Sequence, residues 1–212
     1  WEDLNKYTDR VRKQFLEGKT FDPLFMHYLF DEPNLHKSNS EKFIKERVKY
    51  ISRKNNLFKS HDNNKIKIGY FSADYHNHPL LHIMSDIFKS HDKTKFELYG
   101  FSFGPEKKEN IWREDIKSCF KDFHLVNKLS DEEIKILASN LKIDIAIDLT
   151  GLTKNGRPSL FLKRVAPIQI SYLGYPGTSG NKEIDYIIAD KEVIPKNAEK
   201  YYTEKVIYLP DT

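Results

Sequence analysis

From residue 66 onward, short apolar runs alternate with amphipathic segments, and this alternation constrains the fold more than any other feature of the chain. The apolar runs predict strands at 66–72, 96–103, 123–126, 143–149, 168–173, 186–189 and 206–209. The segments between them predict helices at 79–90, 108–120, 130–141 and 158–164, the first with an inward face of Leu81, Ile83, Met84, Ile87 and Phe88. Strands that alternate with helices build right-handed βαβ units. We therefore expect an α/β fold, with a mostly parallel sheet covered by helices on both faces.

The beginning of the chain follows a helical pattern instead. Apolar side chains recur at spacings of three and four near the N-terminus, which predicts an amphipathic helix there: Leu4, Tyr7, Val11 and Phe15. The aromatic-rich segment 21–30 predicts a short helix. Residues 40–54 predict a longer helix, for which Ser38 and Glu41 have the spacing of a capping box.

A polar, turn-rich segment at 59–65 separates these helices from the first strand. It divides the chain into two expected domains, a helical spacer at 1–60 and a sheet domain at 61–212. The chain begins at Trp1 rather than Met and stops directly after a strand, so we interpret it as part of a longer protein.

Charge and cysteine content narrow the class of protein. The net charge is +4, and basic residues are interspersed with acidic ones, which is typical of solvated helix faces and argues against a nucleic-acid-binding surface. Cys119 is the single cysteine, so neither a disulfide framework nor a cysteine-based zinc site is expected, and its apolar setting predicts a buried side chain. Neither a membrane span nor a signal peptide is recognisable, so we expect a cytoplasmic protein.

In an open parallel sheet, ligands bind beyond the carboxyl ends of the strands. Three loops follow predicted strands at that edge, at 73–82, 150–157 and 174–180. The sheet would bring them together although they lie far apart in the sequence. These loops are the candidate site.

The first loop carries His76, His78 and His82. Three histidines at this spacing could hold a metal, although no carboxylate pattern completes a metal motif. They could also cap a helix or lie in the core. A third reading is that one histidine at a helix N-terminus contacts an anionic group or moves a proton.

The other two loops combine glycines with hydroxyl side chains. The second, DLTGLTKNGR, also holds Lys154 and Arg157 and is either a plain polar turn or a ligand loop. The third, GYPGTSG, either brings backbone N–H groups close to a phosphate or sugar, or is only a rigid turn. Neither a dinucleotide-binding nor a P-loop motif is present in the sequence.

Taken together, three strings resemble one family. KIGYFSADYHNHPLLHIM, IDLTGLTKNGR and APIQISYLGYPGTSG, followed by DYIIADKEVIP and YYTEKVIYLP, are similar to the catalytic region of the protein O-GlcNAc transferases, including bacterial and plant SPINDLY-like members. The resemblance covers about residues 66–212, and the helices before them resemble that family's spacer more weakly. It implies a two-lobed GT-B glycosyltransferase in which this chain is the Rossmann-like N-terminal lobe, and in which the second, UDP-binding lobe is absent from this chain.

The resemblance also implies the reaction. A sugar, expected to be GlcNAc, would move with inversion from a UDP-sugar to a Ser or Thr hydroxyl of an acceptor protein or peptide, without a metal or other cofactor. This chain alone is expected to be inactive. Two alternatives stay open: a non-catalytic binding or assembly lobe, and a related GT-B enzyme with another sugar or acceptor.

The matching motifs carry roles to particular residues. His78 matches a histidine proposed as general base and close to the donor, and Asp122 aligns with a position where some members carry another candidate base. Predicted substrate contacts are His82, Thr153, Lys154, Gly174, Pro176, Gly177 and Thr178; of these, Gly174 and Pro176 match sugar contacts. Leu152 replaces the family's usual aromatic residue, so we expect one acceptor-side contact to be lost.

Overall fold

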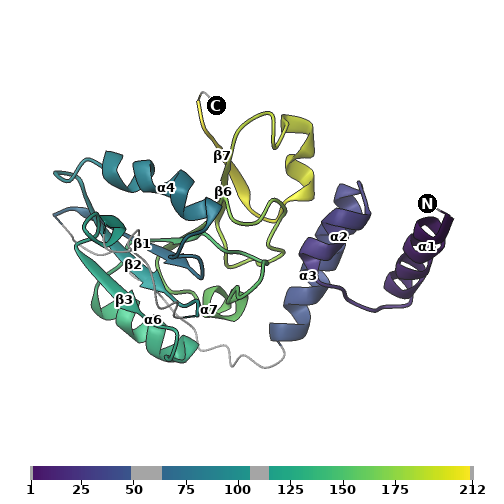
Figure 1. The fold of residues 1–212 in the computed structure, drawn as a ribbon, viewed down its shortest axis with the longest axis horizontal. Coiled ribbons are helices and arrows are strands. Elements are labelled where there is room, and N and C mark those ends of the chain that lie inside the picture. The colour runs from purple at the N-terminus through teal and green to yellow at the C-terminus, as the bar shows by residue number, and fades with distance from the viewer. Residues whose placement is uncertain (1, 49–63, 106–114, 211–212) are drawn as a thin grey trace.

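The computed structural model describes residues 2–48, 64–105 and 115–210 (Figure 1). Its described residues form one seven-stranded sheet in the order β3-β2-β1-β4-β5-β6-β7, and every neighbouring pair is parallel. The strands are β1 (Ile66–Ser72), β2 (Phe96–Ser102), β3 (Asp122–Leu125), β4 (Ile145–Asp148), β5 (Ile168–Tyr172), β6 (Tyr186–Ala189) and β7 (Lys205–Tyr208). The predicted α/β fold with a parallel sheet is confirmed.

β2, β4 and β5 each end one residue before their apolar runs predict, and β4 also begins later. β4 begins at Ile145 rather than at Ile143, because the carboxylate of Asp144 accepts a hydrogen bond from the backbone N–H of Lys67 at 2.9 Å. A side chain thus takes a position in the ladder between β1 and β4 that a backbone carbonyl would otherwise fill.

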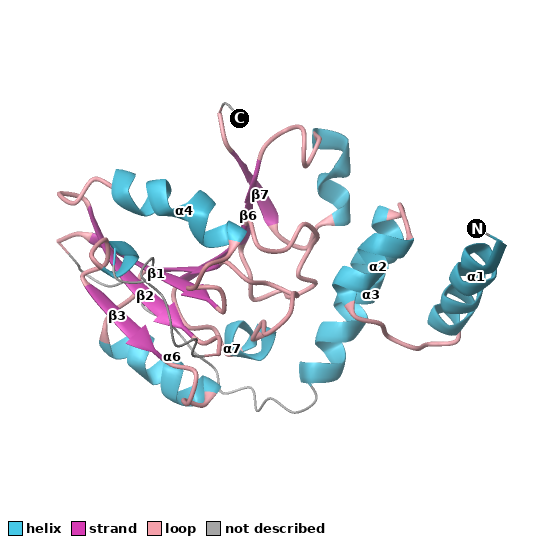
Figure 2. Cartoon of the chain, in the orientation of Figure 1, coloured by secondary structure: helices cyan, strands magenta, loops and turns pink. Residues whose placement is uncertain are grey.

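Helices cover both faces of the sheet, as Figure 2 shows. In chain order they are α1 (Glu2–Leu16), α2 (Pro23–Leu29), α3 (Pro33–Val48), α4 (Pro79–Ser90), α6 (Asp131–Asn140), α7 (Pro158–Leu162) and the 3₁₀ helix η1 (Lys196–Tyr201). The sequence did not predict η1. Of the helix predicted at 108–120, residues 115–117 are helical and residues 106–114 lie outside the described residues.

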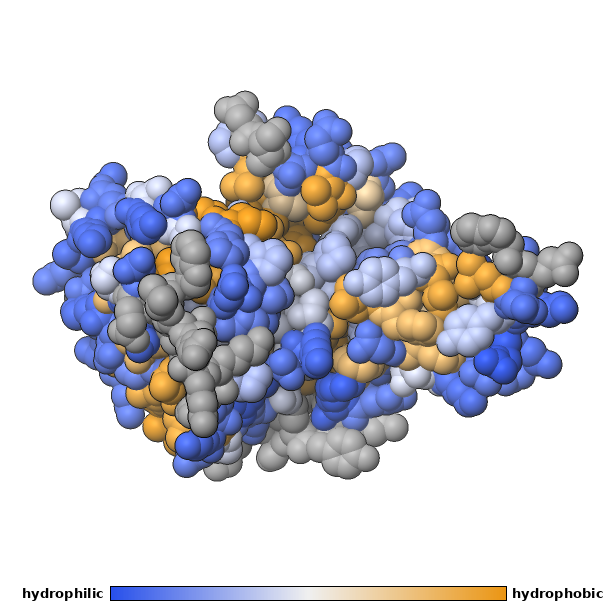
Figure 3. Space-filling model, in the orientation of Figure 1, coloured by the Kyte–Doolittle hydropathy of each residue, from blue (hydrophilic) through white to orange (hydrophobic). Residues whose placement is uncertain are grey.

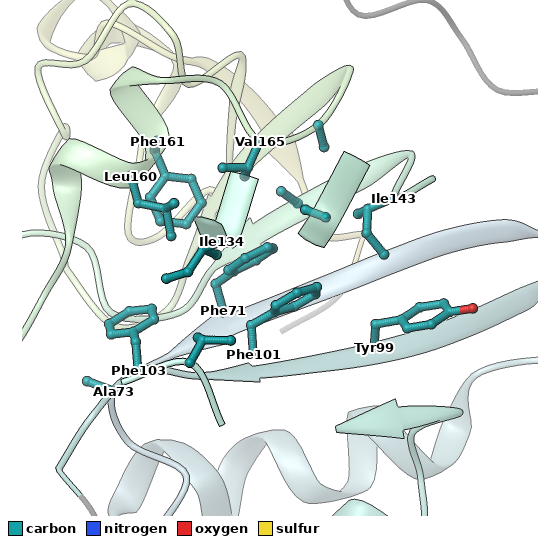
Figure 4. Packing of buried hydrophobic residues seen from close by; sticks show 14 of the residues in the cluster. Phe71, Ala73, Tyr99, Phe101, Phe103, Ile134, Ile143, Leu160, Phe161 and Val165 are labelled. Carbon is teal, nitrogen blue, oxygen red and sulfur yellow. The ribbon is translucent and has the colours of Figure 1, made fainter. Parts of the chain in front are cut away.

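Two aromatic-rich layers form the core. On the face covered by α6 and α7, the rings of Phe71 and Phe101 stack 4.2 Å apart, and Phe161 packs edge-on against Phe71 (Figure 4). On the other face, α4 packs Met84 and Phe88 onto the sheet. Both faces of the sheet are therefore shielded from water. A sheet buried in this way has apolar side chains on both sides of its strands.

The prediction for the buried face of α4 was wrong at one position. Ile83 was expected to point inward but is 56% exposed, whereas Leu80 is 6% exposed. The helix begins at Pro79 and buries positions 80, 81, 84 and 88, a stripe with i, i+4 spacing that leaves residue 83 on the solvent side.

The capping prediction for the third helix was also wrong. α3 begins at Pro33, so Ser38 and Glu41 lie inside the helix rather than at its start. Proline suits the first turn because its missing N–H would have no partner there. Residues 49–54 of the helix predicted at 40–54 and the predicted domain boundary at residues 60–61 lie outside the described residues.

The N-terminal helices pack against the loops of the sheet. Leu152 and Tyr175, which follow β4 and β5, share a small apolar cluster with Ile44 of α3. In α1, Val11 and Phe15 are buried but Leu4 and Tyr7 are exposed. Figure 3 shows apolar atoms gathered over α1 and α2. In the part of the chain that the structure describes, no helix has the length and apolar character needed to cross a membrane.

Candidate functional site

The order of the strands determines where on the sheet the candidate site lies. The chain builds outward from β1 to β2 and β3 on one side, then crosses to β4 and continues to β7 on the other. The carboxyl ends of β1, β4 and β5 are therefore neighbours at the point where the direction reverses, which is where open α/β sheets bind ligands. The three loops that the sequence singled out follow these three strands. The predicted convergence is confirmed.

Thr150 ties the first two loops together. Its side chain is fully buried, and its Oγ1 accepts a hydrogen bond from the backbone N–H of Ala73 at 2.9 Å. The hydroxyl of Ser72 lies 3.4 Å from the same oxygen and also accepts from the N–H of Asp74. Buried hydroxyls thus fix the chain where it leaves β1.

His78 is the N-cap of α4. Its Nδ1 accepts a hydrogen bond from the backbone N–H of Leu80 at 3.2 Å, and its side chain is half-buried. A neutral imidazole that accepts at Nδ1 carries its proton on Nε2, which is then a donor. This arrangement suits a hydrogen bond from Nε2 to an anionic oxygen near the helix N-terminus. To act as a base at Nε2, the ring would have to give up the bond to Leu80.

The other two histidines of the first loop have different surroundings. His76 is buried, with Nε2 3.6 Å from a carboxylate oxygen of Asp74 and its ring 5.5 Å edge-on from that of His78. His82 is exposed and bonds through Nε2 to the side-chain oxygen of Asn77 at 2.9 Å. Within residues 2–48, 64–105 and 115–210, no three His, Cys, Asp or Glu side chains are grouped as metal ligands.

Asp148 is a functional candidate that the sequence reasoning missed. It ends β4 and is 7% exposed, and its Oδ1 accepts hydrogen bonds from the N–H groups of Thr150 and Gly151, each at 2.9 Å. Burial raises the pKa of this carboxyl to about 6, although the two hydrogen bonds oppose the shift. The signal in the sequence was an aspartate followed by a threonine and a glycine at a strand end, which is a turn pattern.

In the second loop, the predicted acceptor contacts lie at the surface. Thr153 is half-buried and donates its hydroxyl hydrogen to the carbonyl of Thr150 at 2.9 Å, and Lys154 is exposed. Leu152, where an acceptor-side aromatic contact was expected to be lost, is buried against α3. Arg157 pairs with Asp131 and is therefore a structural residue.

The third loop starts with a strained turn. Leu173 has φ of +69°, and the N–H of Gly174 bonds to the carbonyl of Tyr172 at 2.8 Å, which closes a three-residue γ-turn around Leu173. A side chain with positive φ is strained, and such strain gathers at functional sites. A Cβ on Gly174 would lie 1.9 Å from the carbonyl oxygen of Leu149. The loop therefore leaves β5 in close contact with the end of β4.

The later glycines of this loop make room for packing against α2 and α3. A Cβ on Gly177 would lie 2.3 Å from Nε2 of His27, and a Cβ on Gly180 would lie 2.5 Å from the backbone of Ser40. These glycines let α2 and α3 approach the loop. Thr178 is buried and its hydroxyl bonds within the protein. Of the predicted contacts in this loop, Gly174 and Pro176 are the ones with solvent access.

Asp122 is not brought to the three loops. It begins β3, the edge strand, and lies opposite Tyr99 in the register, away from the carboxyl ends of the strands. Its carboxylate accepts from the N–H of Phe123 at 2.8 Å and lies 3.3 Å from Nε2 of His124. The structure thus separates the two predicted catalytic residues.

A cavity of about 210 Å³ lies at the opposite edge of the sheet, where the strands begin. Its lining includes Lys65, His91, Phe96, Leu98, Cys119 and Lys121. Cys119 is half-buried there, rather than buried as its sequence setting predicted. Ligands of open parallel sheets bind at the carboxyl edge, so this cavity is separate from the candidate site.

Comparison with known proteins gives a consistent picture. The model of the family Glycosyl transferase family 41 matches residues 37–212. A probable UDP-N-acetylglucosamine–peptide N-acetylglucosaminyltransferase SEC of Arabidopsis thaliana is 37% identical over 146 residues, which are 69% of this chain and 15% of that protein. A UDP-N-acetylglucosamine–peptide N-acetylglucosaminyltransferase of Caenorhabditis elegans is 30% identical over 230 residues, 99% of this chain and 20% of that protein.

Among solved structures, a mutant O-GlcNAc transferase of Thermobaculum terrenum has the same fold over 89% of this chain and 36% of its own, with a TM-score of 0.80 and 23% identity. This chain therefore spans a fifth or less of the length of the two curated relatives.

Proposed function

Because the chain belongs to glycosyltransferase family 41, we propose that it is the N-terminal catalytic lobe of an enzyme that transfers N-acetylglucosamine from UDP-N-acetylglucosamine to Ser or Thr hydroxyls of proteins. The names of the two curated relatives support the donor and the peptide acceptor. The partners would be the UDP-sugar, an acceptor protein and a second lobe of the same protein. We place the enzyme in the cytoplasm.

The observation that carries this proposal is the meeting of three loops at the reversal of strand order, with His78 at the N-terminus of α4 among them. The first and second loops are joined by Thr150, and the second and third by the contact of Gly174 with Leu149. A sugar and an acceptor hydroxyl could both reach such an edge, because its exposed groups include His82, Lys154 and Pro176.

In the reaction, the oxygen of the acceptor hydroxyl forms a bond to the anomeric carbon of the sugar as the bond from that carbon to the diphosphate breaks. The electron pair leaves with UDP, and the hydroxyl proton passes to a base. His78 supplies Nε2–H, a donor that can hold a reacting or leaving oxygen in place. The positive end of α4 adds to this stabilisation of negative charge. No metal is required in this scheme.

Direct transfer assays test the proposal. The full-length protein is incubated with UDP-N-acetylglucosamine or UDP-glucose and with matched peptides that carry Ser/Thr or Asn, and product mass is measured. We expect a gain of one N-acetylhexosamine on the Ser/Thr peptide. Glucose transfer, or modification of the Asn peptide, would assign a related enzyme of another specificity. A folded protein that transfers neither sugar would favour the binding-lobe alternative.

A further inference from the structure

Glu204 is a buried carboxylate beneath the third loop. It lies just before β7 and is 5% exposed. Its Oε1 accepts from the backbone N–H of Ser179 at 2.8 Å and from the Ser179 hydroxyl. Its Oε2 accepts from the hydroxyls of Thr178, at 2.6 Å, and Thr203, at 3.1 Å. Four donors from two segments therefore converge on one side chain.

This carboxylate has no counter-charge: within the described part of the chain, Glu204 takes part in no ion pair. Taking a carboxylate out of water costs free energy that hydrogen bonds must offset. An apolar side chain in the same place would leave these four donors without an acceptor, which destabilises a fold. The carboxylate constrains the loop, because its hydrogen bonds fix where each of its four donors can lie.

The result is a loop with an anchored half and an exposed half. Thr178 and Ser179 turn inward to Glu204, and the Thr178 hydroxyl also accepts from the N–H groups of Gly180, at 3.2 Å, and Thr203, at 3.0 Å. In the other half, Leu173 is 41% exposed and Pro176 is exposed, while Tyr175 packs inward against α3. The anchored half therefore sets the position of the half that includes the strained turn.

We propose that Glu204 is a positioning residue that holds loop 173–180 in the shape needed to meet the transferred sugar. The inference deepens the proposed function and rests on it. Glu204 itself does not touch the substrate: its two oxygens are occupied by Thr178, Ser179 and Thr203. Its effect is transmitted through the backbone of the loop.

A loop that shifts by about 1 Å lowers the rate of the chemical step more than it weakens binding, because orientation matters most in the transition state. For Glu204→Gln, which keeps the size of the side chain but replaces one acceptor oxygen with a donor, we expect kcat to fall about 10- to 100-fold. The KM for UDP-N-acetylglucosamine should stay within about twofold of the wild-type value, because the interactions that bind the ground state and the transition state equally are unchanged.

The experiment compares the full-length protein with Glu204→Gln and with Glu192→Gln, an exposed glutamate of the turn before η1, as the matched control. Steady-state kcat and KM are measured, together with backbone hydrogen exchange of Ser179, Gly180 and Thr203. If Glu204→Gln does not fold, Ser179→Ala removes one of the four bonds and takes its place.

Faster exchange at those three amides, with lower kcat and unchanged KM, supports the proposal. Faster exchange with unchanged kcat overturns it, as does unchanged exchange. A fall in kcat that accompanies faster exchange throughout the sheet also overturns it, because the role would then be structural only. If the wild-type protein shows no transfer activity, the proposed function is wrong, and the positioning role that rests on it is wrong as well.

Discussion

At Asp148, burial and hydrogen bonding act on the same carboxyl group in opposite directions. Burial dominates and raises the pKa to about 6, while the N–H groups of Thr150 and Gly151 favour the ionised form. The residue therefore costs stability in its charged form yet orders the turn that follows β4. Such a group is expected where a turn must keep one geometry beside a ligand.

Asp148→Asn tests this balance, because the amide oxygen can still accept both backbone hydrogen bonds. The folded pKa lies above the unfolded value, so the wild type loses stability as pH rises from about 4 to about 6 and stays at the lower level above that. The variant should match the wild type near pH 4 and exceed it by up to about 3 kcal/mol above pH 6.

Urea unfolding between pH 4 and pH 8 measures this difference. Asp86→Asn, at an exposed aspartate of α4, is the control and should show no such trend. A constant gap between Asp148→Asn and the wild type at all pH values would contradict the raised pKa.

At the scale of elements, β1, α4 and β6 begin and end where the sequence predicted. Their signals are local: alternation, apolar periodicity and a proline at the first turn of α4. The roles of the loop glycines could not be predicted in this way. The neighbour of Gly177 is His27, which lies far away in the sequence, so only the folded chain shows that the glycine makes room for a helix.

Gly174→Ala tests the close approach of the third loop to β4. The added Cβ would meet the backbone carbonyl of Leu149, which cannot rotate away, so we expect a loss of more than about 2 kcal/mol. Gly18→Ala is the control, because its Cβ would meet no atom and only the positive φ of +101° opposes it, at a cost of about 1 kcal/mol. Equal losses in thermal or urea unfolding would show that backbone strain, rather than the contact, decides both.

At the scale of the whole molecule, α2 and α3 meet the sheet at the third loop. His27 of α2 bonds to the Tyr175 hydroxyl at 3.1 Å, and its ring lies 3.9 Å from that of His36. Tyr175 also reaches Ser40 of α3 at 3.5 Å. The sequence predicted a spacer followed by a separate domain, but it could not show that the spacer supports one of the site loops. That contact joins residues from opposite ends of the chain.

Acid should loosen this contact. Burial, with a smaller effect of His36, lowers the pKa of His27 to about 4. The unfolded histidine binds its proton near pH 6.5, so stability is lost as pH falls from about 6.5 toward 4. The hydrogen-exchange protection factors of residues 174–180, which are corrected for the pH dependence of intrinsic exchange, should fall as the pH is lowered over this range, and His27→Gln should remove most of the dependence. A variant with the wild-type pH profile would exclude His27 as the cause.

The most direct test of the proposed site is transfer of N-acetylglucosamine by the full-length protein with His78→Asn, beside wild type and His78→Ala. Asparagine can cap α4 as histidine does but has no imidazole, whereas alanine loses both functions. His91→Gln, at the other end of α4, is the matched control. We expect kcat to fall about 10²- to 10³-fold in both His78 variants, with thermal stability lowered only in His78→Ala. Wild-type turnover by His78→Asn would contradict the account, because His78 would then be no more than a helix cap.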